Sequence, residues 1–88
     1  MRYNTKAELE SVYSKALDLI TDRDTCYGDR WKVQPMEEIL IKAGMKVDGI
    51  RYQFSNGLLG NREKLLEDIR DSMNYLAFLH RRIELEDK

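Results

Sequence analysis

Apolar side chains recur at helical spacing in three separate stretches of the chain. In the first stretch, residues 5–22, they fall at i, i+3, i+4 and i+7, a spacing that places side chains on one face of an α-helix. Thr5 followed by Glu8 has the form of a capping box, so we predict a helix that begins at Thr5 and ends near Asp22. The face that it is expected to bury consists of Leu9, Val12, Tyr13, Ala16, Leu17 and Ile20.

The second stretch begins at Pro35, which suits the first turn of a helix because its missing N–H needs no partner there. We predict a helix from Pro35 to about Phe54, where Ser55-Asn56-Gly57 supplies a stop signal. Gly44 and Gly49 lower its intrinsic helix stability, so a break near Gly49 stays open as an alternative. The expected core stripe is Met36, Ile39, Leu40, Ala43, Val47, Ile50 and Phe54.

The third stretch, residues 61–86, is apolar on two sides, and Asn61 is its expected N-cap. A helix with one solvent-exposed side needs only one apolar face. Because this one has two, we predict that it is central and touches both other helices and a second subunit. The two sides are formed by Leu65, Ile69, Met73, Leu76 and Ile83, and by Tyr75, Phe78 and Leu79. The predicted fold is all-α, a small three-helix antiparallel bundle in one domain of residues 1–88 that dimerisation completes as a multi-helix bundle.

The helical periodicity stops between the first two predicted helices, at about residues 22–35. We expect an ordered functional loop there, because a long loop without secondary structure costs a short chain much conformational entropy. Tyr27 and Trp31 lie on either side of Gly28 in this loop. Such aromatic side chains suit stacking on a nucleotide base, and the alternative is that they plug the top of a small core.

Composition and charge exclude several classes of protein. A chain with 42% hydrophobic and 35% charged residues is too apolar to be disordered. Fifteen basic and sixteen acidic residues give a net charge of −1, which argues against the broad positive field of a nucleic-acid binder. Cys26 is a single cysteine, and no apolar run approaches the ~20 residues that a membrane span needs. We therefore expect a cytoplasmic protein with no membrane partner.

Asp68 and Asp71 are three residues apart on the third predicted helix, so their carboxylates project from adjacent turns of one side. Such a pair suits Mg²⁺, which takes oxygen ligands and keeps waters for contact with a phosphate; solvated surface is the alternative. Glu38, Lys42 and Lys46 recur every four residues on the second predicted helix. They form either a ladder of opposite charges or an edge that contacts phosphate.

The order of these elements resembles a known family. The chain contains Tyr27-Gly28-Asp29-x-Trp31, then the segment 39–43 followed by Lys46 and Arg51, then Asp68-x-x-Asp71-x-x-Asn74-Tyr75. This order is similar to the nucleotide-modification-associated domain of phage and bacterial proteins. That family in turn resembles a branch of the all-α nucleoside triphosphate pyrophosphatases, the MazG and dimeric dUTPase group. The resemblance covers about residues 22–83.

The resemblance implies a dimeric nucleotide-binding domain whose acidic helices hold Mg²⁺ against the phosphates. Glu37 and Glu38 match the first two acids of an E-E-x-x-E element, Ile41 stands at the position of the third, and Asp68-x-x-Asp71 matches an E-x-x-D element. Metal binding is thus assigned to Glu38, Asp68 and Asp71, phosphate binding to Lys42, Lys46 and Arg51, and the nucleotide pocket to Tyr27, Gly28, Asp29, Trp31, Asn74 and Tyr75.

The predicted function is nucleotide binding, with Mg²⁺-dependent hydrolysis of a nucleoside or deoxynucleoside triphosphate to the monophosphate and pyrophosphate if the site is catalytic. Ile41 at an acidic position leaves open whether the site hydrolyses its ligand or only binds it. The alternative is a non-catalytic helical dimerisation or accessory module, whose charged rows are salt-bridged surface.

Overall fold

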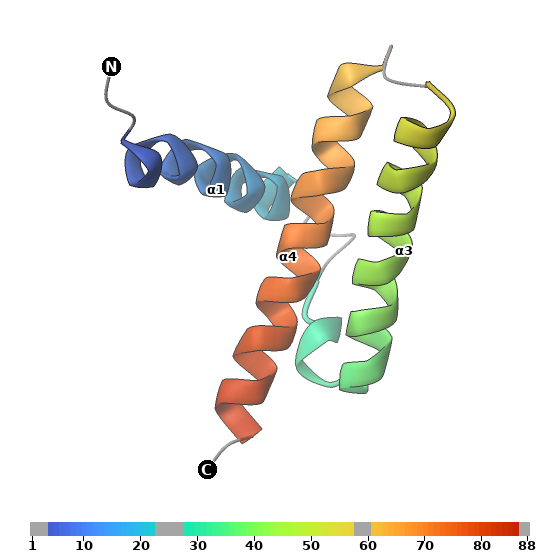
Figure 1. Cartoon of the computed structure of the whole chain (residues 1–88). Helices are drawn as coiled ribbons and strands as arrows, with labels where there is room; N and C mark the ends of the chain where they lie inside the picture. Colours follow the sequence, from blue (N-terminus) through green and yellow to red (C-terminus); the bar gives the residue numbers. More distant parts are fainter. Residues whose placement is uncertain (1–3, 23–27, 58–60, 87–88) are drawn as a thin grey trace.

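The structure is a computed structural model that describes residues 4–22, 28–57 and 61–86. These residues form α1 (Thr5–Asp22), the short 3₁₀ helix η1 (Arg30–Lys32), α3 (Met36–Ser55) and α4 (Arg62–Glu86), and no strand occurs among them (Figure 1). The predicted all-α fold with three helices is confirmed. Within the same ranges, no helix combines the length and the apolar character that crossing a bilayer requires.

The N-terminal ends of α1 and α4 are each capped by an asparagine. In α1 the Asn4 Oδ1 accepts a hydrogen bond from the backbone N–H of Ala7 at 3.2 Å. The predicted cap at Thr5 was therefore wrong by one residue, because asparagine caps a helix at least as well as threonine and precedes it here. In α4 the Asn61 Oδ1 accepts from the N–H of Lys64 at 3.0 Å, which confirms the predicted cap.

α3 starts directly after Pro35 and runs without a break through Gly44 and Gly49. Beyond its last residue, Gly57 has φ of 65°, a left-handed backbone conformation that glycine adopts without steric cost. α4 then runs back antiparallel beside α3 (Figure 1). The sequence signals for a stop and a restart thus produce a helical hairpin.

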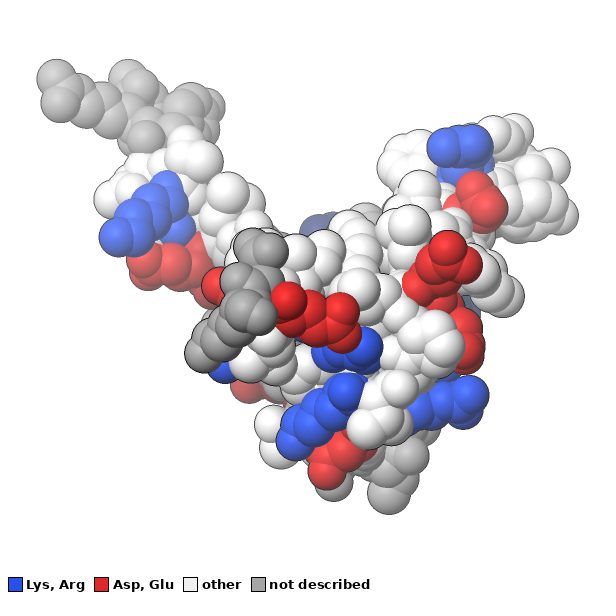
Figure 2. Space-filling view, turned by 90° about the horizontal axis from the view of Figure 1, so that it is seen from below, with Lys and Arg blue, Asp and Glu red and all other residues white. Residues whose placement is uncertain are grey.

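α4 is the central element of the fold, as predicted, and contacts α1, α3 and η1. α1 lies across α4 rather than along it, at the height where Asn74 of α4 meets Ala16 of α1 (Figure 1). Seen from below, the N-terminal half of α1 projects from the body as an arm (Figure 2). The crossing leaves much of α1 without a neighbour in the single chain.

The apolar core of the single chain is small. Ala16, Ile39 and Ala43 are the buried apolar residues of the described ranges. The face of α1 that was predicted to be buried is mostly exposed, because α1 meets α4 only through its C-terminal half; Leu9 is 46%, Tyr13 59% and Leu17 63% exposed. Part of the predicted α3 stripe is exposed as well, namely Leu40, Val47 and Phe54.

Buried polar side chains outnumber buried apolar ones in the described ranges: they are Gln34, Asp68, Asp71, Ser72 and Asn74. The Asn74 Nδ2 donates a hydrogen bond to the carbonyl oxygen of Ala16 at 2.9 Å and so ties α4 to α1. Because a buried amide must be hydrogen-bonded, this contact helps to decide where α1 crosses α4.

We predict that Asn74→Ala lowers the free energy of unfolding by about 1–3 kcal/mol, since it removes a buried hydrogen bond and leaves a small cavity at the α1–α4 contact. Urea unfolding followed by circular dichroism measures the change at a fixed protein concentration. The matched control is Asn56→Ala, which removes an exposed hydrogen bond to Tyr52 within the end of α3. Equal losses for the two variants would show that the Asn74 contact does not hold α1.

Candidate functional site

Five side chains meet between α3 and α4 and form what we call the α3–α4 charge cluster. They are Lys46 and Gln53 of α3 and Lys64, Asp68 and Asp71 of α4. The Lys46 Nζ lies 3.2 Å from the Asp71 Oδ2 and 3.9 Å from the Asp68 Oδ1. The Lys64 Nζ lies 2.7 Å from the Asp68 Oδ1, and the Gln53 Nε2 donates to the Asp68 Oδ2 at 3.1 Å.

The two aspartates of the cluster are buried, with Asp68 7% and Asp71 4% exposed. Two carboxylates on adjacent turns repel each other, and burial makes each charge costly unless it is paired and hydrogen-bonded. Lys46 lowers both costs because its ammonium group lies within ion-pair distance of both carboxylates. The site is therefore an electrostatic network that joins the two helices, not a solvated surface pair.

The charge cluster changes the pKa of Lys64. Its hydrogen bond to Asp68 raises the pKa of Lys64 above the ordinary value of 10.5. Partial burial acts in the opposite direction, and the nearby charges of Asp68, Glu67 and Asp71 add to the rise in the pKa. Lys64 thus stays protonated and keeps Asp68 neutralised well into the alkaline range.

An aromatic cluster adjoins the charge cluster on the same hairpin. Trp31 of η1 stacks on Phe78 with ring centroids 5.1 Å apart, and Tyr75 meets Phe78 edge to face at 6.2 Å. The Lys42 Nζ lies 5.9 Å from the centroid of the Tyr75 ring, a distance at which cation–π attraction operates. Charged and aromatic groups therefore follow one another along the α3–α4 interface.

Arg82 of α4 holds η1 in place. Its Nη1 donates to the carbonyl oxygens of Trp31 at 2.9 Å and Gln34 at 2.6 Å, while its Nη2 donates to the Glu86 Oε1 at 2.9 Å. These bonds position the Trp31 ring over Phe78. Sequence reasoning missed Arg82, because backbone carbonyls accept its hydrogen bonds and leave no signal in the pattern of side chains.

The structure brings together most of the predicted ligand residues that lie on the hairpin, namely Lys42, Lys46, Asp68, Asp71 and Tyr75. Trp31 joins them through Phe78. Its ring is stacked within the protein, which fits the alternative use as a plug as well as a place in a nucleotide pocket.

Other predicted ligand residues lie elsewhere. Arg51 is five residues beyond Lys46 on α3, about 140° around the helix, and so faces away from the charge cluster. Asn74 points to α1. Asp29 pairs with Lys32 at 3.1 Å.

Gly28 has φ of 49°, a left-handed backbone conformation that glycine adopts without steric cost. Tyr27 lies outside the described residues.

Glu38, the third predicted metal ligand, lies two turns of α3 away from Lys46, about 12 Å along the helix axis. It faces Arg30, with the Glu38 Oε1 3.9 Å from the Arg30 Nη2. No group of three or more His, Cys, Asp or Glu residues able to hold a metal ion occurs in the described part of the chain. The predicted three-acid site for Mg²⁺ is thus not assembled in this arrangement, in which lysines contact the oxygens of Asp68 and Asp71.

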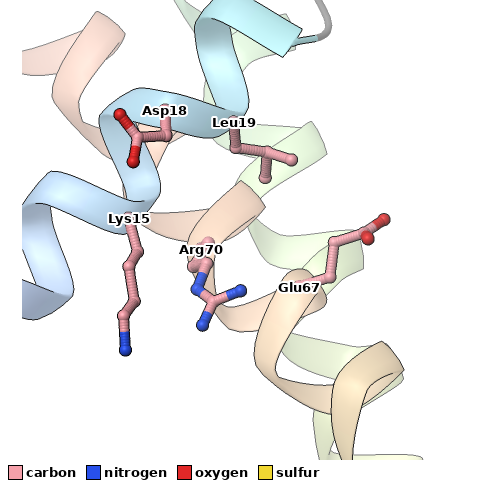
Figure 3. Close-up of a pocket in the computed structure, with 5 residues that line it drawn as sticks. All are labelled: Lys15, Asp18, Leu19, Glu67 and Arg70. Carbon is pink, nitrogen blue, oxygen red and sulfur yellow. The ribbon is translucent and has the colours of Figure 1, made fainter.

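A separate hollow of about 220 Å³ lies between α1 and α4. It is lined by Leu19 and by charged side chains of both signs, Lys15 and Arg70 on one hand and Asp18 and Glu67 on the other. In Figure 3 the side chains of Lys15 and Arg70 point the same way, and Asp18 lies one turn along α1 from Lys15. Because the charges balance, this hollow favours neither an anion nor a cation as a ligand.

Comparison with protein-family models, with curated proteins and with solved structures finds no match to this chain. The resemblance to nucleotide pyrophosphatases therefore stays a prediction, supported by the residues named above.

We predict that the contribution of Lys64 to stability is lost at high pH. The pKa of Lys64 is higher in the folded than in the unfolded chain, so its stabilising effect is complete below about pH 10 and disappears as the pH rises through the folded-state pKa. Thermal unfolding of the wild type and of Lys64→Met between about pH 8 and pH 12 measures this effect. The gap between the two melting temperatures should close above about pH 10.5, whereas the gap between the wild type and Lys6→Met, at an exposed position, should stay small throughout.

Proposed function

We propose that the protein binds a nucleotide along the α3–α4 hairpin. The observation that carries this proposal is the α3–α4 charge cluster, which continues along the same hairpin into the aromatic cluster of Tyr75, Phe78 and Trp31. Apolar residues would join two helices without the cost of burying charges, so buried carboxylates paired with lysines at such an interface support a binding role. Ammonium groups beside aromatic rings match the phosphates and the base of a nucleotide.

The partial exposure of the lysines supports this proposal. The Lys46 side chain is 34% and the Lys64 side chain 55% exposed, so both ammonium groups reach solvent while they contact buried carboxylates. A phosphate can approach these lysines directly, and Lys42 adds a third positive charge beside Tyr75. In this mode the lysines hold the phosphate and no metal ion is needed.

A second mode uses Mg²⁺. Mg²⁺ is commonly bound by one or two carboxylates together with substrate phosphates. Asp68 and Asp71 provide two carboxylates, and the ion would take the place of the Lys46 ammonium group between them. Hydrolysis to the monophosphate and pyrophosphate belongs to this mode, because it requires an activated water; Ile41, which is 59% exposed on α3, supplies no third acid for it.

The second candidate function is a helical dimerisation module without nucleotide turnover. The large apolar side chains exposed on α1, α3 and α4 favour it. Such a module needs no ligand, and its unfolding temperature would not depend on nucleotides or Mg²⁺. Both candidates fit the cytoplasmic location expected from the sequence.

We predict that nucleoside or deoxynucleoside triphosphates raise the melting temperature of the wild-type protein and give measurable heat in calorimetry, since a ligand that binds only the folded state stabilises it by mass action. The panel is measured with Mg²⁺ and with a chelator in its place. A shift in both conditions indicates the lysine mode, and a shift with Mg²⁺ alone indicates the magnesium mode. No shift and no heat with any nucleotide would exclude nucleotide binding and leave the dimerisation module.

The matched variants are Asp71→Asn and Asp48→Asn. Asp71 is buried in the charge cluster, whereas Asp48 is exposed on α3. In the magnesium mode we expect Asp71→Asn to weaken nucleotide affinity by about tenfold or more, because it removes a ligand of the ion. In the lysine mode we expect it to strengthen affinity, because the Asp71 carboxylate competes with phosphate for Lys46. Asp48→Asn should leave affinity unchanged in both modes. Wild-type affinity in Asp71→Asn would place any nucleotide site outside the cluster.

A further inference from the structure

The single chain exposes more surface than a folded monomer of its mass. Its accessible surface is 6918 Å² at 10.4 kDa, whereas the usual scaling gives about 5,400 Å² for this mass. Its radius of gyration is 14.7 Å, against about 12 Å expected for a compact chain of this length. The surplus of about 1,500 Å² per chain is of the size that each subunit of an obligate homodimer buries, about 1,000–2,500 Å².

Several exposed apolar side chains of α1 and α4 lie around a corner between these two helices, which we call the α1–α4 corner. On α1 the row of Leu9, Tyr13 and Leu17 is spaced i, i+4, i+8 and is 46–63% exposed. On α4 the exposed large apolar residues are Leu76 at 47%, Ile83 at 51% and Leu85 at 45%, and Leu76 lines the corner. Between the two helices lies a hollow of about 430 Å³, lined by Tyr13, Met73, Leu76, Ala77 and His80.

Exposed apolar residues also occur on α3, among them Ile41 and Met45, which are 59% and 67% exposed. They belong to one helix, whose outer surface is convex. A corner between two crossing helices buries more area against a partner than one convex helix does, and the N-terminal half of α1 projects from the body as an arm that a partner can contact (Figures 1 and 2). The geometry therefore favours the α1–α4 corner over α3.

We propose that a second copy of this chain docks in the α1–α4 corner. The two α1 helices lie antiparallel about a two-fold axis near Tyr13, so that the N-terminal half of each α1 enters the corner of the other copy. A two-fold interface needs a surface that is complementary to itself, and here each chain supplies both the projecting apolar row and the hollow that receives it. The net charge of −1 leaves little repulsion between two copies.

This pairing is independent of nucleotide binding. The α1–α4 corner is formed with α1, whereas the charge cluster is formed with α3. The failure of one proposal is therefore visible without the other, because dimer mass and nucleotide affinity are separate measurements.

Size-exclusion chromatography with light scattering, over a dilution series, tests the pairing. The wild type is expected at twice the mass of the 10.4 kDa chain. Tyr13→Glu and Leu76→Glu each place a charge in the corner and should raise the dimer dissociation constant at least about tenfold. Met45→Glu makes the same kind of change on α3 and should leave the mass unchanged. A monomeric wild type at all concentrations, or dissociation by Met45→Glu alone, would overturn the proposal.

Crosslinking tests the antiparallel arrangement without a disruptive charge. In a Cys26→Ser background, Tyr13→Cys places a thiol near the two-fold axis, where it meets its own copy across packed helices about 8–10 Å apart. A short bis-maleimide should then join two chains covalently, and Met45→Cys should give no such product. Circular dichroism confirms that both variants are helical. A crosslink at Met45→Cys and none at Tyr13→Cys would contradict the arrangement.

Discussion

The structure depends on how the two buried carboxylates of α4 are neutralised. Asp68 and Asp71 lie where α3 covers α4, and the Lys46 ammonium group reaches both of them. Sliding α3 by one turn would carry Lys46 about 5 Å away and leave the two charges buried and unpaired, which is far costlier than losing an apolar contact. Electrostatics thus sets the register of the hairpin, in which the only buried apolar residues of α3 are Ile39 and Ala43.

α4 locates each of its neighbours by a different polar contact. The charge cluster places α3, Asn74 places α1 through the carbonyl of Ala16, and Arg82 places η1 through two carbonyls. Polar contacts of this kind are directional, so they specify position with little buried apolar area. The apolar side chains that a larger core would have absorbed are left on the surface of α1 and α4, where they are free to pair with a second copy.

Local features of the candidate site were predictable from the sequence, and its long-range geometry was not. The spacing of Asp68 and Asp71 places both on one side of a helix whatever packs against it, and the structure agrees. Whether Glu38 joins them depends on how far α3 slides along α4. In the observed register Lys46 faces the aspartates and Glu38 faces Arg30, an outcome that no spacing within a single helix encodes.

The sequence by itself determined the three helices, the turn at Gly57 and the cap at Asn61, because these depend on hydrogen bonds and side-chain spacing within a few residues. Only the tertiary structure decided which apolar faces are covered. The periodicity of α1 is that of a buried helix, but its steep crossing over α4 leaves Leu9, Tyr13 and Leu17 exposed. The physical reason is that periodicity shows which face of a helix is apolar. Contacts between residues distant in the sequence decide whether this chain or a second copy covers that face.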